Sequence, residues 1–169
     1  MNKLTFTKKD YSETSELAGL IRKIDTIDAE YVNRISDEIF NHQPFYLTVL
    51  LGYRVDISME ELEEMMRIYL LVWEYFGSNE NLRKKKVTQT QFEKVQRRNM
   101  HMLHYSKGES EDPREKIYTD ELQNLKSKAL WTAVLFRYNS RSRLINMNPE
   151  NKGLILIDIL SFIQCFETI

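Results

Sequence analysis

Residues 58–76 have the sequence SMEELEEMMRIYLLVWEYF, and this stretch predicts the class of the fold. Ser58 followed by Glu61 forms a capping box, a pair of side chains that satisfies free N–H groups at the start of a helix. Apolar residues then recur every three or four positions as far as Phe76, and others fill the intervening positions. Gly77 is typical of the position just past a helix end. A helix that is apolar nearly all round is usually buried on several faces, so we expect it near the centre of a helical fold.

The segments before this helix show the same period. After Ser12, the expected N-cap, apolar residues recur at helical spacing as far as Ile39. The pattern predicts either one long helix or two helices with a break near residues 25 and 26. Pro44 suits the first turn of a further helix, which we expect to end at Tyr53, because proline has no N–H group that needs a partner there.

Three more helices are predicted after Gly77. They run from Thr88 or Thr90 to about Ser106, from about Arg114 to Tyr138, and from the Asn148-Pro149 pair into the C-terminal segment. Polar segments at 77–87 and 107–113 and a turn-prone segment at 139–148 separate them. Residues 154–157 also suit a buried strand, but the cap before them and the lack of a partner strand favour a helix. We therefore expect an all-α, single-domain bundle of about six or seven helices over residues 1–169, with a strongly apolar C-terminal helix.

The composition is that of an ordinary globular protein without a dominant charge. The chain has 169 residues, a length that suits one domain. Lys and Arg number 24 and Asp and Glu number 25, so the net charge of −1 excludes a globally basic binder of nucleic acid. The single cysteine excludes a disulfide scaffold. The chain has five glycines and no Walker or Gly-x-Gly-x-x-Gly loop, and we expect no cofactor.

The two ends of the sequence bear on its compartment. The N-terminal residues lack the apolar core of a signal peptide, so a cytoplasmic location is the default expectation. Residues 154–169 are strongly apolar, but they are fewer than the roughly 20 that a membrane span needs and include Asp158 and Gln164. We expect a buried core or interface helix and no membrane partner. Cys165 lies in this segment, where burial should leave its thiol inert.

One segment of the chain concentrates positive charge. Its basic residues are Arg83, Lys84, Lys85, Lys86, Lys94, Arg97 and Arg98, against the single acidic Glu93. Such a run can contact phosphates or an acidic protein, so these seven residues are the candidate partner-binding residues. Arg137, Arg141 and Arg143 would extend the patch if the fold brings them close.

Two histidines are the candidate metal ligands. His101 and His104 lie three residues apart on a predicted helix, so both could reach one metal ion. They lie opposite the stripe formed by Phe92, Val95, Asn99 and Met102, which places them on the solvent side. Arg97 shares their face and would repel a cation, and no third or fourth ligand is evident. We therefore expect a solvated polar face here and assign no metal site.

Two groups of carboxylates also invite a functional interpretation. Glu38 and His42 could pair across one helical turn, but a histidine that stabilises the end of its helix is the better interpretation. Glu60, Glu61, Glu63 and Glu64 stand at a helix start, where negative charge is favourable and solvated. Neither group offers the dry cleft that raises the pKa of a catalytic carboxyl group.

Taken together, the residues favour a function without catalysis. The chain has no Gly-x-Ser-x-Gly or His-Glu-x-x-His motif. Tyrosines occur throughout the predicted helices, at Tyr46, Tyr53, Tyr69, Tyr75, Tyr105, Tyr118 and Tyr138. They suit interfaces or the wet edge of a core equally well. We expect a helical protein-interaction or regulatory protein that binds another protein or itself, and a homodimer that buries part of the C-terminal helix is one concrete hypothesis. The alternatives are a nucleic-acid-binding regulator that uses residues 83–98 and a metal-dependent enzyme that uses His101 and His104.

Overall fold

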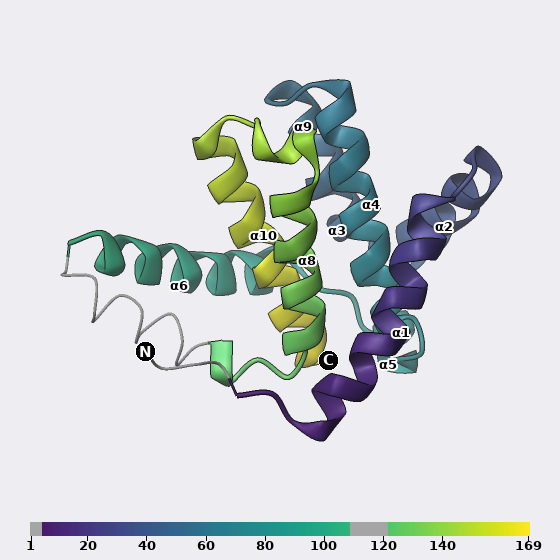
Figure 1. Ribbon diagram of the computed structural model, residues 1–169, viewed down its shortest axis with the longest axis horizontal. Helices are drawn as coiled ribbons and strands as arrows, with labels where there is room; N and C mark the ends of the chain where they lie inside the picture. The colour runs from purple at the N-terminus through teal and green to yellow at the C-terminus, as the bar shows by residue number, and fades with distance from the viewer. Residues whose placement is uncertain (1–4, 109–121) are drawn as a thin grey trace.

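The computed structural model describes residues 5–108 and 122–169, with side chains described as far as Met102 in the first range. Every regular element in these two ranges is a helix, which confirms the predicted all-α class (Figure 1). The elements are α1 (Lys8–Asp25), α2 (Ala29–His42), α3 (Pro44–Gly52), the 3₁₀ turn η1 (Tyr53–Val55), α4 (Met59–Phe76), α5 (Glu80–Lys84), α6 (Gln89–Gly108), α8 (Lys128–Ser140), α9 (Ser142–Ile145) and α10 (Pro149–Glu167). Seven of these α-helices have nine residues or more, and α5 and α9 are shorter.

Helix α4 lies at the centre of the fold, as the sequence predicts. The predicted capping box is present, since Ser58 Oγ accepts from the Glu61 amide at 3.2 Å and Glu61 Oε2 accepts from the Ser58 amide at 2.8 Å. Residues 68–73 are buried without interruption, so α4 has no free face at this level. It packs against α1, α3, α8, α9 and α10. The chain itself therefore covers α4 at the level of residues 68–73.

Helix α10 is the second buried helix. Asn148 Oδ1 accepts from the amide of Glu150 at 2.9 Å, and Pro149 opens the first turn, as predicted. The helix is continuous through residues 154–157, so the strand interpretation is wrong. Its aromatic side chains fill the core, where Phe162 stacks on Phe92 of α6 with ring centroids 4.3 Å apart. Figure 1 shows α4, α8 and α10 upright near the middle of the view, with α6 on one side and α1 and α2 on the other.

The first helix begins earlier than predicted, and the break after it is present. Thr7, not Ser12, is the N-cap of α1, and it forms a capping box with Asp10. Ser12 is an exposed residue inside the helix. Of the two alternatives for residues 12–39, the two-helix one is correct, because Thr26 caps the end of α1 and Asp28 Oδ1 accepts from the Tyr31 amide at 2.8 Å to start α2.

The predicted helix over residues 114–138 is not continuous. Residues 114–121 and Tyr118 lie outside the described part of the chain, and a turn at residues 124–127 separates Leu122 from α8. The physical reason is a distant contact, since the Ser127 amide donates to Glu167 Oε1 at 2.6 Å. Two predicted connections also contain short helices, α5 and α9, each anchored by one buried leucine, Leu82 and Leu144. Within residues 5–108 and 122–169, no helix is long and apolar enough to cross a membrane.

Candidate functional site

A groove between α2, α3 and α4 is the strongest candidate for a binding site. It has a volume of about 400 Å³, within the range of ligand-binding clefts. Its lining consists of Ser36, Ile39, Leu47, Leu50, Leu51, Met59, Glu60, Leu62, Glu63, Met66 and Leu70. The α4 residues of this set recur at three- and four-residue spacing, which places them on one face of the helix. We call this site the α2–α3–α4 groove.

Apolar side chains of the α2–α3–α4 groove face solvent. Met59 is 71% exposed and Leu51 is 50% exposed. Phe40, which is also well exposed, lies outside the lining, one helical turn after Ser36 on α2. Single exposed apolar residues are common, and Leu51 and Met59 differ from such residues in that both line the same groove.

Buried tyrosines hold the walls of the groove in place. Tyr46 of α3 donates to the backbone carbonyl of Tyr69 in α4 at 2.8 Å. Tyr53, in the turn that follows α3, donates to Asp158 Oδ2 of α10 at 2.8 Å, and its hydroxyl lies 2.8 Å from that of Tyr69. Burial raises the pKa of all three phenols well above their usual range. These tyrosines are therefore neutral hydrogen-bonding parts of the core and not interface residues.

Asp158 is the one buried carboxylate of this network, and its role is structural. Gln96 Nε2 donates to Asp158 Oδ1 at 2.6 Å, so both carboxylate oxygens have partners. Burial raises its pKa, and the hydrogen bonds from Gln96 and Tyr53 oppose that rise. Asp158 is only 4% exposed, and its two oxygens are occupied by Tyr53 and Gln96.

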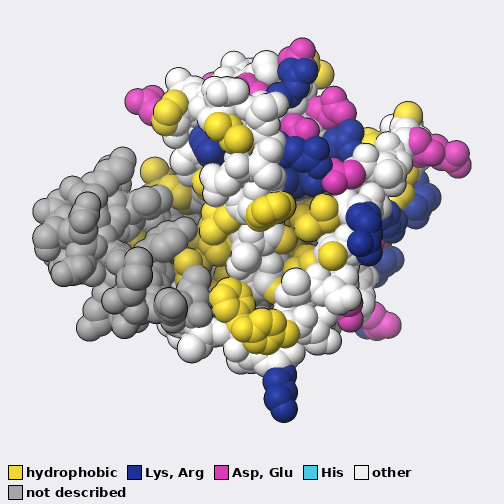
Figure 2. All heavy atoms as spheres, viewed as in Figure 1, with side chains coloured by type: hydrophobic (Ala, Val, Ile, Leu, Met, Phe, Trp, Pro, Cys, Tyr) yellow, Lys and Arg dark blue, Asp and Glu magenta, His cyan; other side chains and the backbone are white. Residues whose placement is uncertain are grey.

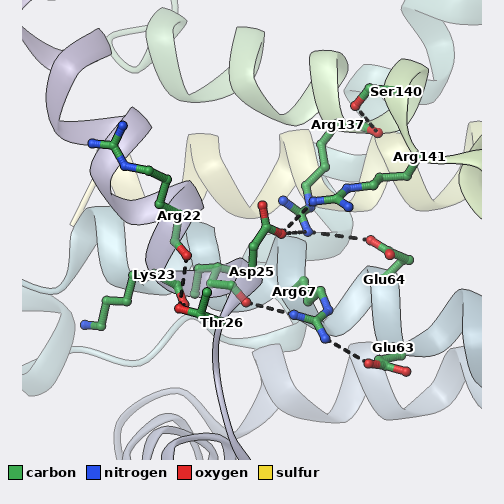
Figure 3. Close-up of polar contacts among 11 residues, drawn as sticks. Arg22, Lys23, Asp25, Thr26, Glu63, Glu64, Arg67, Arg137, Ser140 and Arg141 are labelled. Atoms are coloured by element: carbon green, nitrogen blue, oxygen red, sulfur yellow. Dashed lines mark hydrogen bonds and ion pairs between the residues drawn. The ribbon is translucent and has the colours of Figure 1, made fainter.

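A second polar cluster joins the end of α1 to α4 and α8 (Figure 3). The buried Arg137 donates through Nη2 to Asp25 Oδ1 at 2.7 Å and lies 3.6 Å from Glu64 Oε2. Arg141 donates to the same Asp25 oxygen at 2.6 Å. Arg67 joins the cluster from α4, where its guanidinium donates to the backbone carbonyl of residue 24 at 2.8 Å. These contacts come from three different helices and fix their relative positions.

This cluster corrects two sequence-based expectations. Arg137 and Arg141 pair with Asp25, and Arg143 lies 3.9 Å from Glu60, so each of these three arginines lies beside a carboxylate and none extends the basic segment. Figure 2 shows basic and acidic side chains intermixed over the end of the molecule where α4 and α9 lie. Glu64, expected to be solvated, is largely covered because it faces Arg137.

The basic segment itself is divided between two places. Arg83 pairs with Glu38 at 2.8 Å, and His42 contacts the Arg83 carbonyl at 3.1 Å, so Glu38 and His42 hold this segment and do not pair with each other. Lys84 lies 3.5 Å from the exposed Glu80. The other five candidates are all exposed. Two of them, Lys85 and Lys86, follow α5, and the other three, Lys94, Arg97 and Arg98, lie on α6.

Two of the exposed cations line a separate groove of about 340 Å³. Lys94 and Arg98 of α6 share it with Cys165 and Thr168 at the end of α10. The C-terminal end of a helix carries partial negative charge, which disfavours a phosphate at this position. Cys165 is buried as expected, and burial raises the pKa of its thiol to about 11, which favours the inert cysteine that the sequence predicts.

The histidines do not form a metal site with other described residues. His101 is exposed on α6, whereas the side chain of His104 lies outside the described part of the chain. Across the described side chains, no three His, Cys, Asp or Glu residues are grouped so that they could hold a metal ion. The opposite stripe is in the core as predicted, with Phe92 and Asn99 buried.

Sequence reasoning missed the α2–α3–α4 groove because it arises between three helices. The available signal was the position of Leu51 and Met59 at the edge of the buried stripes of their helices. No family model, curated protein or solved structure matches the chain. The function must therefore be inferred from the groove and its surroundings.

Proposed function

We propose that this protein is a non-catalytic interaction protein that binds a helix of another protein in the α2–α3–α4 groove. The observation that carries this proposal is the contiguous apolar lining with Leu51 and Met59 open to solvent. Docking an amphipathic helix into an apolar groove is a common mode of recognition between proteins.

The dimensions of the groove suit such a helix. Its α4 wall extends from Met59 to Leu70, which is about 16 Å at the rise of an α-helix. A partner helix of about three turns would cover this length and place apolar side chains at positions i, i+4 and i+7 in the groove.

The other hypotheses have less support. Most apolar residues of α10 pack inside the fold against α6 and α4, so a homodimer could use only its outer side, around Leu154 and Ile157. The basic segment is divided, and Arg83 is already paired with Glu38. Nothing in the described side chains adds a third ligand to His101.

Site-specific photo-crosslinking in cells of the native source tests the proposal. A benzoylphenylalanine at Met59 probes the groove, and the same residue at Tyr11, which is 70% exposed on α1, is the matched control. We expect Met59 to give an adduct with a helical segment of a different protein that Tyr11 does not give. The same adducts from both positions, or no adduct at Met59, would overturn the proposal.

A further inference from the structure

We infer that the helix bound in the α2–α3–α4 groove carries Lys or Arg residues on both sides of its apolar stripe. This inference rests on the proposed function and specifies the chemistry of the partner. It follows from the sign of the charges around the groove.

The charged residues that line the groove are both acidic. Glu60 and Glu63 lie in the lining, and both are exposed. Asp37 follows the lining residue Ser36 on α2 and Asp56 lies just before α4, and both are exposed as well. Among the described side chains, no Lys or Arg belongs to the lining.

Cations near the groove offset part of this charge, and one of them, the exposed Arg54, follows the lining residue Leu51 by three positions. Arg67 bridges Glu63 and the backbone at the end of α1, so it is held on the α1 side of α4. Arg143 lies 3.9 Å from Glu60, and both side chains are 57% exposed, which makes this a weak pair. Because Arg67 pairs with Glu63 at 2.9 Å, the remaining acidic charge at or beside the groove comes from Glu60, Asp37 and Asp56.

The same charges disfavour a second copy of this chain as the occupant. A two-fold contact buries the same surface of both copies, so Glu60 and Glu63 of each copy would lie in one interface with those of the other. Like charges placed together at an interface cost free energy and act against the wrong partner. A helix with basic flanks has the complementary pattern, because its cations meet the glutamates while its apolar stripe meets Leu51 and Met59.

Three helical peptides of about 15 residues test this inference. Each peptide carries a chemical staple that holds it helical, because short free helices are marginal in water. They share one apolar stripe at i, i+4, i+7 and i+11 and carry Lys, Gln or Glu at the flanking positions. Fluorescence anisotropy with the full chain at about 50 mM salt measures their affinities. We expect the Lys peptide to bind about tenfold more tightly than the Glu peptide, with a difference that shrinks as salt rises.

Charge reversal in the protein supplies the control. The double variant Glu60→Lys/Glu63→Lys should reverse the order of the three peptides. The double variant Glu16→Lys/Glu80→Lys changes the net charge equally at exposed residues outside the groove and should keep the wild-type order.

The remaining outcomes separate the inference from the proposed function. Equal affinities of the three peptides for the wild type would overturn the inference about charge and leave helix docking in place. No binding of any peptide would overturn helix docking itself. A wild-type dimer in sedimentation equilibrium that Leu51→Asp converts to monomer would identify a second copy as the occupant and overturn the inference.

Discussion

Replacing Arg137 by methionine tests whether the cluster in Figure 3 holds α1, α4 and α8 together. The Arg137 side chain is only 4% exposed, so its charge is matched inside the protein and not by water. Methionine retains most of the apolar stem of arginine but is shorter, and it removes the guanidinium. The change breaks the 2.7 Å hydrogen bond to Asp25 and the 3.6 Å contact with Glu64.

The expected loss in free energy of unfolding follows from what each partner retains. Asp25 keeps Arg141 at 2.6 Å, so its carboxylate is not left alone. Glu64 loses its nearby cation while it stays largely covered, and the lost hydrogen bond from Arg137 to Asp25, which joins charged groups, contributes about 1.5–3 kcal/mol. We therefore expect Arg137→Met to lower the free energy of unfolding by about 2–3 kcal/mol, below the roughly 3–5 kcal/mol for a fully stranded buried charge.

Two further variants make the measurement specific. Adding Glu64→Gln to Arg137→Met removes the stranded charge and should recover about 1 kcal/mol. Arg143→Met is the matched control, because Arg143 forms an exposed pair at 3.9 Å and should change stability by less than about 0.5 kcal/mol. Urea unfolding at pH 7 followed by circular dichroism gives each value. Equal losses for Arg137→Met and Arg143→Met would refute the role assigned to the cluster.

Three other predictions concern the buried polar groups. Burial raises the pKa of Asp158 above 3.8, so between about pH 4 and the raised pKa the folded protein retains a proton that the unfolded chain releases. The free energy of unfolding should therefore fall as the pH rises through this range. Asp158→Asn should remove that fall from a series of urea titrations, and an unchanged pH slope would disprove it. Gln43 donates to the Leu82 and Lys85 carbonyls at 2.7 Å and accepts from the Val87 amide at 2.9 Å, so Gln43→Met should cost about 2–3 kcal/mol. The Val87 amide should then lose protection from hydrogen exchange, and retained protection would count against this anchor. Because burial raises the pKa of the Cys165 thiol to about 11, Ellman's reagent at pH 8 should react slowly with the native protein and rapidly in urea; rapid native labelling would contradict its burial.

Local signals in the sequence predicted those elements whose ends depend on neighbouring residues. The Ser58 capping box and the Asn148-Pro149 start are both present, because their partners lie within three residues. The break before α8 could not be predicted, since the Ser127 amide is held by Glu167, 40 positions away. Long-range contacts of this kind are invisible to a local pattern.

The same limit applies to the candidate site. Arg137 looked like part of a basic patch, but its partner Asp25 is 112 positions away and reverses that interpretation. The α2–α3–α4 groove depends on three helices meeting, and the sequence showed only that Leu51 and Met59 lie on predominantly apolar helices. The general expectation of a protein-binding function remains a proposal, and the structure gives it a specific surface to test.

The most direct test of helix docking is a map of the bound peptide by NMR. The Lys-flanked peptide is titrated into the ¹⁵N-labelled full chain, and amide shift changes are followed residue by residue. Binding in the α2–α3–α4 groove predicts changes at Leu47, Leu51, Met59 and Leu62, with none along residues 83–98. Changes confined to residues 83–98, or no changes at all, would contradict it.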